Sequence, residues 1–431
     1  MVPVQKALDI DAPVQKVFKL LPDPKYPEYP KRMRVTQLGS FVTCALIALL
    51  VSSLALLLGP GPRASAMANN GVAGHVYVLN NDLSGSNSIT VFNRQEDGSL
   101  KLLGTTSIGG LGSVAAFADG TQGSLILARD ERTRLFAVDA GSDQISVVNV
   151  QGGHLSLAGV FGSHGAGPVS LSYRDDLLYV LNAANGRNQA ANVAGFHVDD
   201  QGRLHPVAGA TRPLSAARPN AAEVQIDPSG QVLLVTEKGT NLIDVYRMHH
   251  DGSLSGPTTF SSVGAVPFGM AFNLASPREF IVTDAAGGPN NTGAATAYRL
   301  ADGSIQLITG PVFDHQIAPC WLVITHDGHF AYTSNADSHA ISGYRIHANG
   351  KISLLNANGV TATTPSDTFP LEEALSRNSS FLYVLDSRLL LTPPGPATLS
   401  GFLIHQDGSL TTVVAPDKFT LPVSAIGLAA E

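Results

Sequence analysis

The sequence has very little cysteine. Of its 2 cysteines, Cys44 lies in an apolar N-terminal segment and Cys320 lies far from it. If the N-terminal segment is removed, no intramolecular disulfide can form, so core burial must stabilise the fold, which a chain of 431 residues can supply. Cys320 stands beside Trp321 in an apolar run, which favours a small buried hydrophobic residue over a nucleophile.

Charged residues are also scarce, at 14% of the chain, with a formal net charge of −7. Apart from a short stretch near the N-terminus there is no run of Lys and Arg, so we expect no nucleic-acid partner, because neutralising phosphates requires clustered cations. The chain instead contains 43 Gly, 26 Pro and 44% hydrophobic residues. This mixture is typical of short strands joined by tight turns.

The N-terminal region has the pattern of an export signal. An uncharged apolar stretch from Phe41 to Leu58 follows three basic residues, and small residues stand at Ala64, Ala66 and Ala68. This order predicts a signal peptide cleaved close to Ala66 or Ala68, and a secreted or periplasmic protein without stable membrane insertion. The alternative is an uncleaved anchor formed by residues 41–58, since this stretch is barely long enough to span a bilayer.

Two short motifs recur seven times along the rest of the chain. One is a β-favouring run that ends in a polar residue, and the copies are on average about 51 residues apart. These terminal residues are Asn80, Asp139, Asn182, Glu237, Asp284, Asn335 and Asp386. The other is a turn glycine, usually after Asp, that supplies the positive φ of a hairpin turn. These glycines are Gly98, Gly153, Gly202, Gly252, Gly303, Gly350 and Gly408.

A repeat of this length with four strands predicts an all-β, seven-bladed β-propeller. Within each blade we expect an inner strand A, a strand B that ends in the polar residue, a strand C, the glycine turn and an outer strand D. The tail from Pro422 to Leu428 is expected to supply the inner strand that the first blade lacks, which removes an exposed edge. The predicted organisation is a disordered extension with the signal n-region (1–40), the hydrophobic region and cleavage site (41–68) and the propeller (69–431).

Several motifs carry a family resemblance. They are a Gly-x-x-Pro before inner strands, as in residues 264–267, the run Ala318-Pro319-Cys320-Trp321, and the repeated Asp-Gly-Ser-Leu. On these motifs residues 72–431 resemble the β-propeller lactonase family, which includes 6-phosphogluconolactonases and, more distantly, carboxymuconate-lactonizing enzymes. The chain departs from the family where enzymes tend to carry Pro-His (here Pro219-Asn220), Asp-Leu-Gly (here 237–239) and a basic residue near Pro267 (here Phe268). Catalysis therefore does not follow from the resemblance alone.

Strand order places the strand B tips and the connections between blades around one mouth of the propeller. Asn and Asp tips can simply close turns, but the longer Glu237 is poorly suited to that role and is the predicted general base, with His164 as the other candidate. Arg218, together with Lys238, is expected to clamp a carboxylate or stabilise an oxyanion. The other predicted substrate-binding residues are Asn220, Asp284, His315 and Asn335.

Two functions follow from this arrangement. One is hydrolysis of a sugar-acid or related lactone, as the resemblance implies. The other is non-catalytic binding outside the cytoplasm, because the strand B runs also look like the Tyr-Val-Thr-Asn repeats of cell-surface propellers. We expect no cofactor and no oligomer. We also assign no metal, because no ligand spacing demands one, although carboxyl and amide oxygens suit a hard cation such as calcium.

Overall fold

The computed structural model describes residues 71–114, 122–129, 132–184, 189–286 and 292–431. The predicted leader and its cleavage site lie outside these residues. Within the described ranges, no helix is long and apolar enough to cross a membrane.

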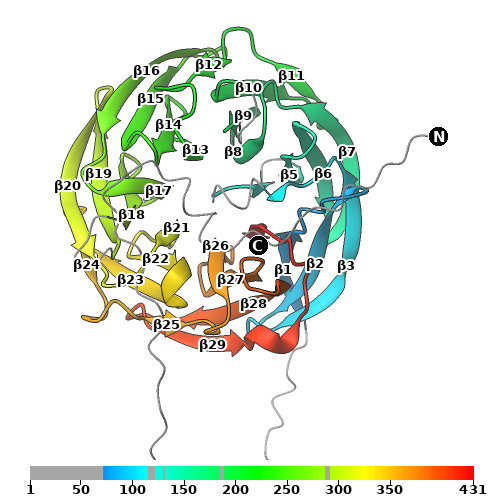
Figure 1. Ribbon diagram of the computed structural model, residues 1–431, viewed down its shortest axis with the longest axis vertical. Coiled ribbons are helices and arrows are strands. Elements are labelled where there is room, and N and C mark those ends of the chain that lie inside the picture. The colour runs from blue at the N-terminus through cyan, green and yellow to red at the C-terminus, as the bar shows by residue number, and fades with distance from the viewer. Residues whose placement is uncertain (1–70, 115–121, 130–131, 185–188, 287–291) are drawn as a thin grey trace, which may run out of the picture.

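The described residues form seven antiparallel sheets around one axis, which confirms the predicted seven-bladed β-propeller (Figure 1). The inner strands are β30 (Gly427–Ala430), β4 (Leu125–Arg129), β8 (Pro168–Arg174), β13 (Ala221–Ile226), β17 (Ala265–Phe272), β21 (Pro319–Ile324) and β26 (Phe369–Leu375). The B strands are β1 (Val72–Leu79), β5 (Thr133–Asp139), β9 (Leu177–Asn182), β14 (Val232–Glu237), β18 (Glu279–Ala286), β22 (Phe330–Asn335) and β27 (Phe381–Arg388).

The C strands are β2 (Asn87–Gln95), β6 (Gln144–Gln151), β10 (Asn192–Val198), β15 (Leu242–Met248), β19 (Ala294–Ala301), β23 (Ala340–Ile346) and β28 (Gly395–Ile404). The outer strands are β3 (Leu100–Gly109), β7 (His154–Gly162), β11 (Leu204–Pro206) with β12 (Arg212–Pro213), β16 (Leu254–Ser261), β20 (Ser304–Phe313), β24 (Ile352–Leu354) with β25 (Ala362–Thr363), and β29 (Leu410–Val414). Blades 1 to 7 are numbered in this order. In blades 3 and 6 the outer strand is split into two pieces that pair with the same C strand.

Blade 1 is closed by the C-terminal strand, as predicted. Its sheet has the order β3-β2-β1-β30, and Val76 to Leu79 pair with Ala430 to Gly427. The strand begins at Gly427 rather than at Pro422, because Ala425 N–H donates to the Pro422 carbonyl in a turn. Glu431 then accepts hydrogen bonds from Tyr77 Oη (2.8 Å) and, through its carbonyl, from Arg94 Nε (2.9 Å). The last strand thus joins the two ends of the ring.

The repeated glycine turns also hold neighbouring blades together. In three places a buried strand B tyrosine donates a hydrogen bond to the turn-glycine carbonyl of the next blade. These pairs are Tyr179 with Gly252 (2.5 Å), Tyr332 with Gly408 (2.9 Å) and Tyr383 with Gly98 (2.8 Å). Each of these glycines has a φ between 77° and 90°, which a residue with a Cβ rarely adopts. The sequence repeat therefore encodes both the turn and the contact between blades.

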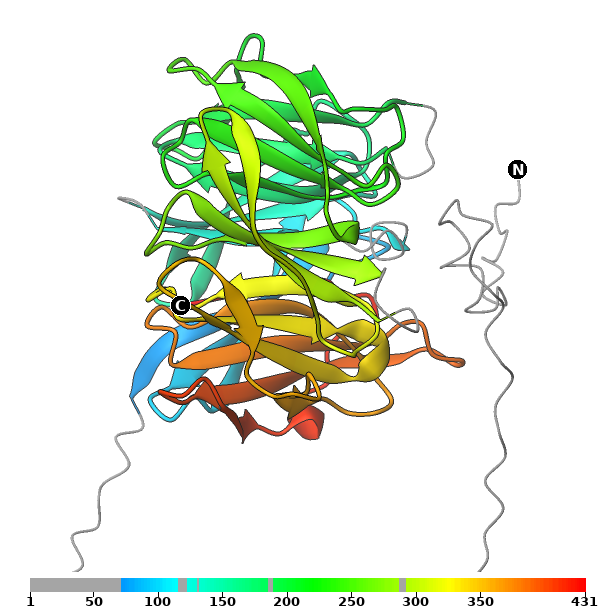
Figure 2. The same cartoon turned by 90° about the vertical axis from the view of Figure 1, so that its left-hand side faces the viewer.

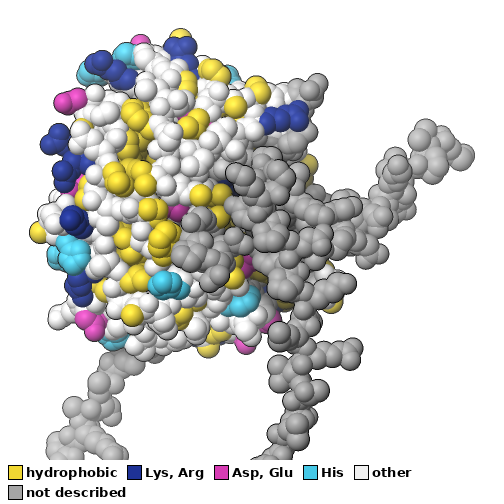
Figure 3. Space-filling view, turned by 60° about the vertical axis from the view of Figure 1, so that its left-hand side comes forward, with side chains coloured by type: hydrophobic (Ala, Val, Ile, Leu, Met, Phe, Trp, Pro, Cys, Tyr) yellow, Lys and Arg dark blue, Asp and Glu magenta, His cyan; other side chains and the backbone are white. Residues whose placement is uncertain are grey.

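The strands run between the two faces of the disc, as the side view shows (Figure 2). The glycine turns lie at one face, and the B–C connections and the connections between blades lie at the other. On outer strand β20 the apolar side chain of Leu307 is exposed, and Lys and Arg gather along the left-hand edge of the space-filling view (Figure 3). The described residues also include two 3-10 turns: η4 (Ala336–Ser338) lies between β22 and β23, and η5 (Pro416–Lys418) follows β29.

Candidate functional site

The polar strand B tips are buried, although the fold places them near the predicted mouth. Asp284 and Asn335, both predicted to contact substrate, are fully buried, and the tips of the other blades are at most 2% exposed. Each of these two side chains bonds a hydroxyl of strand C: Thr296 Oγ1 donates to Asp284 Oδ2 (2.5 Å), and Asn335 Nδ2 donates to Ser342 Oγ (2.8 Å). These two tips therefore fasten strand B to strand C.

Burial also sets the protonation of these tips. It raises the pKa of Asp139 and of Asp386 to about 7 and that of Asp284 to about 8. The cause is the loss of water around the charged form, which the hydrogen bonds from strand C only partly offset. The acidic tips hold protons more tightly than carboxyl groups in water and act as structural hydrogen-bonding groups.

The glycine of the Gly-x-x-Pro motif is required for steric reasons. A Cβ on Gly264 would lie 1.9 Å from Cγ of Asp284, and one on Gly165 would lie 2.5 Å from Cγ of Asn182. The backbone of each incoming connection therefore rests directly on the strand B tip. The proline, Pro267 in this blade, then pairs with the tip at the start of the inner strand. This part of the resemblance reflects packing rather than catalysis.

Glu237 differs from the other six tips, which are Asn or Asp, and it is fully buried. Its carboxylate accepts hydrogen bonds from Ser215 N–H (3.0 Å) and from the hydroxyls of Ser215 and Thr240. Both oxygens of Glu237, the predicted base, are therefore engaged by Ser215 from the connection into blade 4 and by Thr240.

A second acid lies beside Glu237. Asp244 occupies the strand C position where blades 1, 2, 5, 6 and 7 carry a hydroxyl, and the same Ser215 N–H donates to its Oδ2 (3.0 Å). Burial and then the charge of Glu237 raise the pKa of Asp244 to about 8. Two buried carboxyl groups this close favour holding a shared proton.

Apolar residues near the first ends of the inner strands line the mouth. They are Val169, Ala222, Phe268, Cys320 and Leu371, all buried in one core cluster. Lys238 follows the tip of β14 and is only 6% exposed, with Nζ 4.6 Å from the centroid of the Phe268 ring. The Trp321 ring packs against Phe268, with the two ring centroids 5.3 Å apart. An ammonium group is thus held against aromatic rings at the edge of the channel.

Asp337 in η4 shares this neighbourhood. Burial raises the pKa of the Cys320 thiol to about 12, while the charge of Lys238 lowers it and that of Asp337 raises it. The cation and the carboxylate therefore act on the same thiol. Burial also raises the pKa of Asp337 itself, and His339 partly offsets that rise. We call Lys238, Phe268, Cys320, Trp321 and Asp337 the entrance cluster.

Polar side chains span the channel below the entrance cluster. The Gln122 amide bonds Leu322 of blade 6 twice, from Nε2 to the carbonyl (2.8 Å) and from Leu322 N–H to Oε1 (2.9 Å). Glu372 of blade 7 accepts from Gly123 N–H (2.7 Å), and Glu223 accepts from Met270 N–H (2.5 Å). Burial raises the pKa of Glu372 to about 8 and that of Glu223 well above its usual value. The bonds of Gln122 and Glu372 connect blades that are not neighbours, whereas the bond of Glu223 joins the neighbouring blades 4 and 5.

The remaining predicted residues lie on the connections between blades. Asn220 is half-buried with φ of 53°, and its carbonyl accepts from Lys238 N–H (3.1 Å), so the fold brings these two together. Arg218 is exposed on the same connection. His164 and His315 are exposed in the connections into blades 3 and 6, and the His164 ring stands edge-on to Phe196 at 5.2 Å.

Sequence reasoning missed Asp337 and named Trp321 only as part of a family motif and as the neighbour of Cys320. Asp337 follows the tip Asn335 by two residues, so the rule that places B–C connections at the mouth could have found it. The contact of Lys238 with Phe268 joins different blades, and no local sequence pattern indicates it. Across the described ranges, no group of three or more His, Cys, Asp or Glu side chains is arranged to hold a metal ion.

Fold and entrance together define an all-β, seven-bladed propeller whose channel mouth carries the buried Lys238. The family model for the seven-bladed β-propeller lactonases matches residues 43–213 and 109–388. The chain belongs to this lactonase family. No curated protein matches the chain.

Many solved structures are similar in fold. A putative 6-phosphogluconolactonase from Bacteroides fragilis has a TM-score of 0.60 at 17% identity, covering 85% of this chain and 99% of the other. A periplasmic gluconolactonase from Pseudomonas aeruginosa has a TM-score of 0.60 at 19% identity, covering 83% and 98%. A protein from Lactobacillus plantarum has a TM-score of 0.64 at 16% identity, covering 83% and 99%. At these identities the likeness concerns the fold.

Proposed function

We propose that the entrance cluster binds and hydrolyses the lactone of a sugar acid. The observation that carries this proposal is the buried Lys238 ammonium, held 4.6 Å from the Phe268 ring centroid beside Trp321. In so little water a cation attracts a carboxylate or a developing oxyanion much more strongly than it does in solvent.

In the proposed reaction, Asp337 takes a proton from water as the water oxygen attacks the lactone carbonyl carbon. Partial burial raises the pKa of Asp337, which makes it a stronger base than a carboxylate in water. Lys238 stabilises the oxyanion of the tetrahedral intermediate. The ring C–O bond then breaks, and the proton passes from Asp337 to the leaving alkoxide, giving the open hydroxy acid. Arg218 and His164 are proposed to contact the acid's polar substituents from outside.

Export is part of the proposal. The N-terminal signal pattern predicts a protein outside the cytoplasm, and one similar fold is that of a protein described as a periplasmic gluconolactonase. Such a protein would meet lactones outside the cytoplasm. N-terminal sequencing of the exported protein tests this, and the expected first residue lies between 65 and 70.

The test is hydrolysis by the purified exported protein of a panel that includes glucono-δ-lactone and 6-phosphogluconolactone. Lys238→Met removes the charge but keeps an unbranched side chain, and is expected to lower kcat/KM by about 10²–10³-fold. The matched control is Lys351→Met, an exposed lysine beside a glycine turn on the other face, with turnover unchanged.

Two further variants separate the candidate bases. Asp337→Asn is expected to lower kcat by about 10²-fold or more, whereas Glu237→Gln is expected to leave kcat within a few-fold of wild type because Glu237 is buried. A large loss in Glu237→Gln alone, with folding intact, would restore Glu237 as the base. No turnover of any lactone by the folded protein would instead favour a non-catalytic binding propeller.

A further inference from the structure

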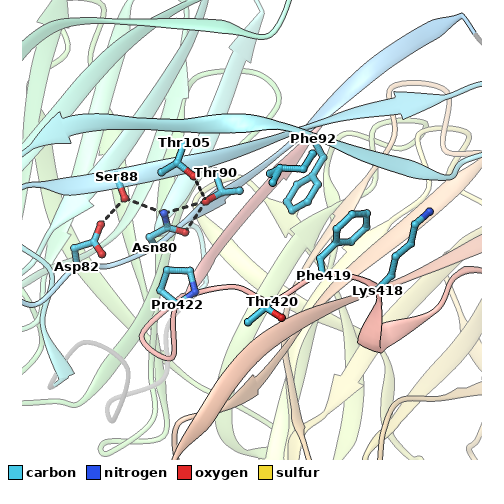
Figure 4. Close-up of a pocket in the computed structure, with 11 residues that line it drawn as sticks. Asn80, Asp82, Ser88, Thr90, Phe92, Thr105, Lys418, Phe419, Thr420 and Pro422 are labelled. Carbon is cyan, nitrogen blue, oxygen red and sulfur yellow. Dashed lines mark hydrogen bonds between the residues drawn. The ribbon is translucent and has the colours of Figure 1, made fainter.

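A second hollow lies away from the entrance cluster, at the seam where the ring closes. It has a volume of about 510 Å³ and lies between blade 1 and the segment that leads into β30 (Figure 4). None of its residues belongs to the entrance cluster. We call it the seam pocket, and its lining is Asn80, Asp82, Ser88, Thr90, Phe92, Leu102, Thr105, Lys418, Phe419, Thr420 and Pro422.

The segment that enters blade 1 differs from those that enter blades 2, 3 and 5. In blades 2, 3 and 5 a glycine of the incoming connection packs against the strand B tip, at Gly110, Gly165 and Gly264. The segment entering blade 1 has no glycine between Ala415 and Ile426. It leans instead on blade 7, where Leu421 N–H donates to the Ala397 carbonyl (2.9 Å).

One wall of the seam pocket is a connected set of hydrogen-bonding groups. Asn80 Nδ2 donates to Ser88 Oγ (2.8 Å) and Thr90 Oγ1 (3.0 Å), and Thr90 Oγ1 bonds Thr105 Oγ1 (3.0 Å). The Ser88 hydroxyl also donates to the Asp82 carboxylate. Hydroxyl groups rotate, so this wall can present either donors or acceptors to a ligand. The fold holds the wall in place without any ligand.

The opposite wall is aromatic. The half-buried Phe419 ring lies 4.8 Å from that of buried Phe92, and Lys418 Nζ is 5.4 Å from the Phe419 centroid. With Asp82 on the polar wall, the two charged groups have opposite signs. The Asp82 carboxylate would repel a strongly anionic ligand such as a nucleotide, whereas it would not repel a neutral polyhydroxylated ring.

We propose that the seam pocket binds a saccharide ring, separately from the entrance cluster. A pyranose has an apolar C–H face that can pack on Phe419, and hydroxyls around its edge that match the row from Asp82 to Thr105. The volume falls within the range of about 300–1,000 Å³ usual for small-ligand sites. This inference does not depend on lactone hydrolysis, because it concerns binding at another place in the fold.

The test is titration of the purified protein with D-glucose, D-gluconate and maltose, followed by calorimetry and by ligand-observed NMR. Thr105→Val removes one exposed hydroxyl of the pocket wall and Phe419→Ala removes the aromatic surface; each is expected to weaken saccharide binding about tenfold or more. The matched control is Thr106→Val, the next residue of β3, which points to the other side of the sheet and should bind as wild type does.

Lys238→Met separates this site from the entrance cluster, and saccharide binding should be unchanged in that variant. The inference is overturned if none of the three sugars binds, if Thr105→Val and Phe419→Ala both bind normally, or if Lys238→Met abolishes binding. Stronger binding of gluconate, an open-chain anion, than of glucose would also overturn the proposal, because it would indicate an anion site at Lys418 rather than a site for a saccharide ring.

Discussion

Replacing Leu428 by Ala should weaken the closure of the ring. Leu428 is 3% exposed and belongs to a core cluster that joins β30 to blades 1 and 7, with Val78 and Leu385 among its members. Removing a buried leucine side chain costs its transfer free energy plus the cavity left behind, about 2–5 kcal/mol. Because a folded domain is stable by only about 5–15 kcal/mol, the loss is a large fraction of the total.

The assay is equilibrium unfolding in guanidinium chloride, followed by circular dichroism and by fluorescence. Trp321 is the single tryptophan of the chain and lies in blade 6, so its fluorescence reports whether blades far from the seam unfold together with it. The control is Leu307→Ala on outer strand β20, where the side chain is 51% exposed, and a change within about 0.5 kcal/mol is expected there. Deletion of residues 427–431 should be more severe still. Equal free energies of unfolding for Leu428→Ala and Leu307→Ala would refute the closure argument.

Three other outcomes follow from the buried groups. First, stability should fall as pH rises from about 4 to about 8, because in this window folded Asp244, with its pKa raised to about 8, keeps a proton that the unfolded chain has lost; Asp244→Asn should flatten the fall in pH-dependent unfolding, and an unchanged slope would contradict the assignment. Second, Gly264→Ala should lower the free energy of unfolding by about 1–3 kcal/mol, because the new Cβ would overlap the strand B carboxylate. Gly104→Ala, whose new Cβ would meet open space, should leave stability unchanged. Equal midpoints of the two variants in thermal unfolding would contradict this steric explanation. Third, Cys320 should resist alkylation by iodoacetamide at pH 8 until the protein unfolds, since its thiol is buried with a pKa of about 12; rapid labelling of the native protein, measured by mass spectrometry, would disprove this.

The sequence determined the architecture because a blade is a local unit. The repeated tips and turn glycines each use a backbone or side-chain property that acts within a few residues, so seven copies predict seven sheets. Even the closing strand could be predicted, since the first blade lacked an inner strand and the tail offered one. The predicted start of that strand at Pro422 was early, because a turn from Pro422 to Ala425 comes first.

Only the tertiary structure decided which polar residues are available to a ligand. Glu237 stood out in the sequence by its length, yet Ser215 from a preceding connection covers it. Lys238 was one predicted contact among several until the fold placed Phe268 from the next blade beneath its ammonium group. Burial and contacts between blades arise from segments far apart in the chain, so periodicity can predict where a tip lies in the ring but not whether water reaches it.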